Sequence, residues 1–169
     1  MGYAKTLSQL VLELLRDNLP SGKFKGFYNG DPLAIPQSSL PCICVSNQAS
    51  RYEFGPTGHD ENNRVIVIKA VFNKKDVFGK SPEQANLELL IENSVEGIDE
   101  ETGELSQQTI VGILRRNTNL GTGLSSARLL GGNIDINYLE ANQRPQDVIT
   151  HEAIIRVEVQ RILRVSDRI

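Results

Sequence analysis

The sequence is poor in the residues that most often build reaction centres or stacking sites. Its 169 residues include two cysteines, two histidines and no tryptophan, and aromatic residues make up 5%. The few aromatic side chains argue against a base-stacking or carbohydrate-binding groove. No apolar run approaches the roughly 18 residues of a membrane-spanning helix, and MGYAKTLSQL lacks the pattern of a signal peptide. We therefore expect no membrane partner.

The two cysteines, Cys42 and Cys44, stand two positions apart in the segment PCICVS. On a strand they would point to the same face, where a disulfide between them has poor geometry. No histidine or further cysteine completes a four-ligand metal set. The sequence therefore predicts two small buried apolar side chains in a reduced, cytosolic protein, with no metal.

Charge and length give similarly ordinary expectations. The net charge of −3 offers no electrostatic case for sequence-independent nucleic-acid binding, which needs several cations on one face. The chain is long enough to bury one core without disulfides, so we expect a single domain over residues 1–169.

Apolar periodicity predicts three helical segments. Spacings of three and four residues from Tyr3 to Leu15 predict an amphipathic helix that ends near Asn18. Ser81, with Pro82 and Gln84 after it, has the pattern of a helix start, and residues 108–117 form a third helical piece. The expected buried side of the second helix consists of Leu87, Leu90, Ile91, Val95 and Ile98.

Strand patterns surround these helices. KFKGFY reads as a short edge strand leading, through a proline-bearing loop, to the strand CICVS. RVIVIKAVF has apolar residues on both faces and predicts a central strand. The polar stretches at 49–63 and 117–130 are expected to be loops, because they contain glycine and few apolar residues.

The last two strands are predicted to pair as an antiparallel hairpin. Ile134, Ile136 and Tyr138 alternate with polar residues, and a polar connection at 140–151 leads into HEAIIRVEVQRILRV. In that final strand the residues Ala153, Ile155, Val157 and Val159 share one face. The whole order favours an α+β fold, a mainly antiparallel β-sheet with helices packed on one face.

None of the catalytic or cofactor-binding motifs considered is complete in this sequence. GTGLSSA, residues 121–127, has Ser126 where a dinucleotide fingerprint needs a third glycine or alanine, and His151-Glu152 has Ile155 where a zinc protease needs its second histidine. The acidic run from Asp99 to Glu104 lacks the spacing of a calcium loop, and no Gly-x-Ser-x-Gly elbow occurs. We therefore expect neither an enzyme nor a cofactor.

Arginines gather near the carboxyl end, at Arg156, Arg161, Arg164 and Arg168. Three interpretations stay open: cross-strand ion pairs on an exposed sheet face, a subunit or partner interface, and passive contact with DNA passing nearby. The two long polar segments and the edge of a long terminal hairpin favour an assembly component over a catalyst.

The arrangement as a whole resembles a known family. An amphipathic helix and LPSG turn lead to LPCICV and RVIVIKAVF, followed by SPEQANLELLIENSVEGI and the closing strand AIIRVEVQRI. This resembles the tail terminator, or tail completion, proteins of long-tailed bacteriophages. The resemblance implies a small α+β fold and a hexameric ring that caps the tail tube, ends its polymerisation and presents the head-joining surface.

The partners implied by this resemblance are copies of the chain, the tail tube protein and a head-completion or neck protein, in a virion assembled in the host cytoplasm. A ring of identical chains needs a head-to-tail interface that closes on itself. Reversing the charge at Arg156 and Arg161 is expected to impair ring formation or tail capping. The alternatives are another neck component, such as a connector or stopper, and a small ligand-binding enzyme. The candidate interface residues are Arg51, Tyr52, Phe54, Tyr138, Arg144, Arg156, Arg161 and Arg164.

Overall fold

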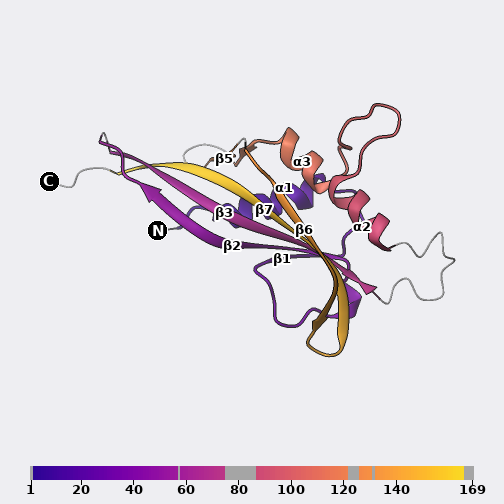
Figure 1. Ribbon diagram of the computed structural model, residues 1–169. Coiled ribbons are helices and arrows are strands. Elements are labelled where there is room, and N and C mark those ends of the chain that lie inside the picture. Colours follow the sequence, from indigo (N-terminus) through magenta and orange to yellow (C-terminus); the bar gives the residue numbers. More distant parts are fainter. Residues whose placement is uncertain (1, 57, 75–86, 122–125, 131, 166–169) are drawn as a thin grey trace.

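The computed structural model is an α+β fold built on one curled, mostly antiparallel sheet, as predicted (Figure 1). It describes residues 2–56, 58–74, 87–121, 126–130 and 132–165. The strands lie in the order β1-β2-β3-β7-β5-β4, β6 also pairs with β7, and only β1 is parallel to its neighbour. The elements are α1 (Leu7–Asn18), β1 (Gly26–Asn29), the 3-10 helix η1 (Gln37–Ser39), β2 (Cys42–Glu53), β3 (His59–Asn73), α2 (Leu87–Glu96), α3 (Ile110–Arg116), β4 (Asn119–Leu120), β5 (Ala127–Leu129), β6 (Asp135–Arg144) and β7 (Val148–Arg164).

The main core lies between the three α-helices and one face of the sheet. β3 is the central strand of that core: it pairs with β2 on one side and with β7 on the other. Ile68 of β3 and Ile155 of β7 are opposite each other and fully buried, and α1, α2 and α3 contribute to the same cluster. The prediction that Ala153, Ile155, Val157 and Val159 share the buried face of the last strand is confirmed.

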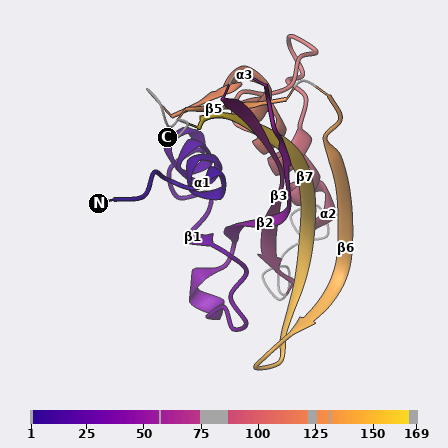
Figure 2. The ribbon, with the colours of Figure 1, turned by 90° about the vertical axis from the view of Figure 1, so that its left-hand side faces the viewer.

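The opposite face, here called the outer face, is covered near β1 by the segment between β1 and β2. Ile35 and Leu40 of that segment pack on Cys42, Cys44 and Val71 in a second, smaller cluster. Figure 2 shows the curled sheet with α1 on its inner side and β6 beyond β7. The two faces of β2 therefore belong to two different cores.

The first helix begins later than its apolar spacing suggested. Thr6 is the N-cap: its hydroxyl accepts a hydrogen bond from the Gln9 backbone, and the Gln9 side chain accepts one from the Thr6 backbone. Tyr3 lies outside the helix and is fully exposed, so its assignment to the helix face is wrong. The capping box makes Leu7 the first helical residue, and residues 2–5 have no regular secondary structure.

In α2 the predicted buried side is only partly right. Leu87, Ile91 and Val95 are buried, whereas Leu90 and Ile98 are exposed. Ile98 lies beyond the helix, which ends at Glu96, so the helical spacing no longer applies to it. The predicted start signal at Ser81, Pro82 and Gln84 lies outside the described residues.

The predicted polar loops are largely strands. Residues 49–53 complete β2 and residues 59–63 begin β3, so the hairpin tip is only residues 54–58. The stretch 117–130 contains β4 and β5, and the connection at 140–151 shrinks to residues 145–147 between β6 and β7. The sequence pattern missed these strands because their side chains have little apolar alternation, whereas backbone pairing holds them in the sheet. No helix among the described residues is long and apolar enough to cross a membrane.

Candidate functional site

The most distinctive surface is a three-stranded arm formed by residues 47–56, 58–65 and 160–164. It continues β2, β3 and β7 beyond the helical layer, toward the left of Figure 1. From Asn47 to Glu53 every residue of β2 is exposed. β1 covers the edge of β2 only from Cys42 to Val45, so no described strand pairs with the outer edge of the arm. The bulge at Gln48 and the charges of Arg51 and Glu53 are the usual protection of such an edge against indiscriminate pairing.

Side-chain hydrogen bonds hold the arm together where apolar burial is absent. Asn62 is buried, and its amide donates to the Ser50 hydroxyl at 2.9 Å and to the Arg51 carbonyl at 3.2 Å. At the tip, the Gly55 backbone donates to Asp60 Oδ1 at 3.0 Å. The Val165 backbone donates to the Gly58 carbonyl at 2.7 Å, which ties the tip to the end of β7. These hydrogen bonds therefore link β2 to β3, and the hairpin tip to the end of β7.

The tip of the arm carries exposed apolar side chains. Phe54 is 83% exposed and Tyr52 48% exposed, and Ile162 and Val165 are exposed on the adjoining end of β7. Large apolar side chains gathered at a projecting end are typical of a surface that another molecule covers.

Five of the eight predicted interface residues come together on the arm. Arg51, Tyr52 and Phe54 lie along its β2 edge and tip, and the β3 residue Asn62 pairs with both Tyr52 and Arg161. The Arg161 guanidinium donates to the Lys5 carbonyl at 2.9 Å, which fastens the N-terminal segment to the arm, and burial lowers the Arg161 pKa. Arg164, opposite His59, is exposed. Arg156 sits at the root of the arm and donates to the Gln48 side chain at 3.2 Å.

The remaining two predicted residues lie on β6, away from the arm. The Tyr138 hydroxyl donates to Glu96 of α2 at 2.9 Å, and burial together with this carboxylate raises the Tyr138 pKa. Arg144 is only 9% exposed and belongs to an internal ion network, so the structure gives it a structural role.

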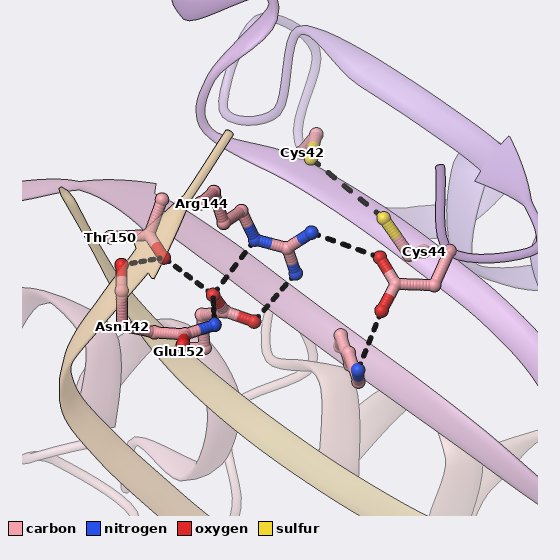
Figure 3. Close-up of polar contacts among 8 residues, drawn as sticks. Cys42, Cys44, Asn142, Arg144, Thr150 and Glu152 are labelled. Atoms are coloured by element: carbon pink, nitrogen blue, oxygen red, sulfur yellow. Dashed lines mark hydrogen bonds and ion pairs between the residues drawn. The ribbon is translucent and has the colours of Figure 1, made fainter. Parts of the chain in front are cut away.

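That network joins four segments across the outer face (Figure 3). Arg144 Nε and Nη2 donate to the two carboxylate oxygens of Glu152, at 2.9 and 2.7 Å. Arg144 Nη1 donates to Asp31 at 3.0 Å, and Lys69 Nζ donates to the other oxygen of Asp31 at 2.6 Å. Two further hydrogen bonds reach Glu152, from Thr150 and from Asn142. Asp31 thus clamps the segment after β1 onto β3 and β6.

Hydrogen bonds keep both carboxylates of the network charged. Glu152 is 1% exposed, and burial alone would raise its pKa, but the hydrogen bonds from Arg144, Thr150 and Asn142 lower it below the ordinary value. Asp31 shows the same balance, with burial opposed by Lys69 and Arg144. The pKa of Arg144 is raised, first by its hydrogen bonds to Glu152. The network contains no uncompensated buried charge.

The cysteines adjoin this network on the outer face. Cys42 and Cys44 are free and buried on the same face, as predicted, with 4.0 Å between their sulfur atoms. The hydrogen bond with Cys44 and burial raise the pKa of Cys42, which keeps it a thiol. No group of three potential metal ligands occurs among the described residues.

His151 gives the fold a predicted sensitivity to mild acid. It is 4% exposed beside Phe72, its Nε2 has no partner within the described part of the chain, and burial followed by Lys74 lowers its pKa. Glu140 and Glu88 oppose that shift. The unfolded chain therefore binds more protons, and the free energy of unfolding should fall as the pH drops below the ordinary histidine value of 6.5.

Chemical unfolding between pH 7.5 and 5.5 measures this effect. His151→Gln should flatten the pH dependence, because it removes the buried imidazole. Equal pH profiles for the parent and His151→Gln would contradict the assignment.

No protein-family model matches this chain, and no curated protein matches its sequence.

Proposed function

We propose that this chain is a structural virion protein, a tail terminator that forms a ring, caps the phage tail tube, ends tube polymerisation and presents the head-joining surface. It acts in the tail or neck of the virion and has no catalytic role. The proposal takes its family from the sequence resemblance, and its hexameric stoichiometry is that of the family.

The observation that carries this proposal is the arm with its exposed apolar tip. Strands that project beyond the core are held mainly by backbone hydrogen bonds and gain little from apolar contacts. Tyr52 and Phe54, at the far end of the arm, are exposed and contribute nothing to the core. A rigid projection with an apolar end suits docking onto another protein, here the last ring of the tail tube.

The buried network adds to this argument. It ties together the segment after β1 and the strands β3, β6 and β7, from which Asp31, Lys69, Arg144 and Glu152 respectively come. A ring subunit needs such a rigid base, since its contacts close only when each copy presents the same angle to the next.

Tube assembly in the presence of this chain tests the proposal. Purified tail tube protein polymerising with substoichiometric amounts of the chain should give shorter tubes, with the chain at tube ends in electron micrographs. Tubes of unchanged length with bare ends would contradict the proposal. Binding to portal-side proteins in place of tube ends would favour a connector or stopper.

A further inference from the structure

A pocket of about 550 Å³ lies beside the arm, on the β5 side of β7. Strand β5 pairs with β7 only at Val159 and Gln160, so the edge of β7 from Arg161 to Arg164 has no strand partner on this side among the described residues. The pocket occupies that gap and is lined by His59, Arg128, Gln160 and Arg164, among others. The pocket is therefore a recess beside the unpaired edge of β7.

The recess is basic, and none of the described residues that line it is acidic. Arg128 is held in place because its Nε and Nη2 donate to Gln160 Oε1, at 3.3 and 3.1 Å, while Gln160 donates to Glu61 at 3.1 Å. In the described part of the chain, Arg128 Nη1 has no hydrogen-bond partner, and neither Arg128 nor Arg164 has an ion-pair partner. Two exposed guanidinium groups and the His59 imidazole thus face solvent around one recess. Such a site selects carboxylates or phosphates.

An acidic turn of complementary charge lies elsewhere on the same chain, between α2 and α3. Glu100, Glu101 and Glu104 are exposed and make no ion pair with a described residue. Their turn is ordered: Asp99 Oδ1 accepts from the backbones of Glu101 and Thr102, and Arg116 donates to the Leu105 carbonyl at 2.6 Å. In Figure 1 this turn projects at the upper right, well away from β7 and the arm.

We propose that the acidic turn (residues 99–104) of one chain docks into the basic recess of a second copy. One molecule cannot satisfy both surfaces because they lie far apart on it, so each copy uses its turn on one neighbour and its recess on the other. That contact is head-to-tail, the type that closes into rings. The inference rests on the proposed ring and names the contact that forms it; the arm tip remains for the tube.

Charge reversal on each surface, followed by mixing, tests the docking. Arg128→Glu with Arg164→Glu, and separately Glu100→Lys with Glu101→Lys and Glu104→Lys, should each weaken self-association at least about 100-fold in native mass spectrometry or sedimentation. An equimolar mixture of the two variants should form assemblies again, because the reversed charges are complementary. The matched control, Lys25→Glu with Arg115→Glu, reverses two exposed bases elsewhere and should assemble as the parent chain does.

The outcomes separate this contact from the proposed function. If either reversed variant forms the same assembly as the parent chain, the proposed docking is wrong, whereas the proposal of a ring is unaffected. The docking is also wrong if those variants assemble normally and lose only their binding to a short DNA duplex; the recess would then be a phosphate-binding site. A mixture that stays dissociated would also overturn the docking. Restored assemblies that leave tube ends bare would uphold the docking and refute tail capping.

Discussion

Arg144→Met is expected to lower the free energy of unfolding by about 3–5 kcal/mol, the usual cost of removing one partner of a buried ion pair. The reason is the Glu152 carboxylate, which is 1% exposed and would lose both guanidinium bonds while it stays buried. Asp31 would lose one of its two cationic partners in the same variant. Urea unfolding at pH 7 measures the change.

Two variants show whether the loss belongs to the network. Arg115→Met removes an exposed arginine from α3 and should change stability by no more than about 0.5 kcal/mol. Arg144→Met combined with Glu152→Gln should cost less than the sum of the single variants, because the amide removes the stranded charge. Additive losses, or a small loss in Arg144→Met alone, would show that the network contributes little.

The network also predicts loss of stability in stronger acid than His151 does. Glu152 has a folded pKa below its ordinary value of 4.5, so its contribution is present above that pH and disappears as the pH falls through the folded pKa. As the pH falls, the loss of stability that His151 causes therefore begins before the loss that Glu152 causes.

Tyr52→Ser with Phe54→Ser is expected to abolish tube capping while leaving the fold and the self-association of the chain unchanged. Both side chains are exposed at the arm tip, so their loss should change the free energy of unfolding by no more than about 0.5 kcal/mol. Aromatic anchors at an interface commonly contribute about 2 kcal/mol or more each, so the double variant should bind tube ends at least roughly 100-fold more weakly.

Leu33→Ser provides the matched control for this pair. Leu33 is 87% exposed but lies in the segment after β1, away from the arm. Binding to tube ends, measured by labelled chain on preformed tubes, should be unchanged by Leu33→Ser. Equal binding by the arm variant and the parent would show that the arm tip is not the tube contact.

The elements that sequence reasoning predicted well are those in which apolar spacing coincides with burial. α1 and the buried face of β7 follow their periodicity, because each packs one face against the main core. The central strand β3 is buried on both faces, as its apolar residues on both faces predict. The parts of β2 and β3 that form the arm were missed for the opposite reason. Their side chains are mostly exposed, so the backbone pairing that holds them leaves no alternating signal in the sequence.

Bulges explain why the role of Arg144 was not foreseen. Strand β6 shifts register between Leu139 and Asn142, so Arg144 lies on the same face as Leu139 and Glu152, where simple alternation places it on the other. The bulge at Gln48 changes the face of Tyr52 in the same way. Asp31 reaches Arg144 from the far end of the sequence, a long-range contact that no local pattern announces.

The mass of the chain in solution tests the central claim most directly, because the account requires identical copies to close into a ring. Native mass measurement over a range of micromolar concentrations should show one assembly near six times the chain mass of 18.7 kDa, weakening as salt screens the charged contacts. A monomer at every concentration, alone and with tail tube protein, would contradict the account.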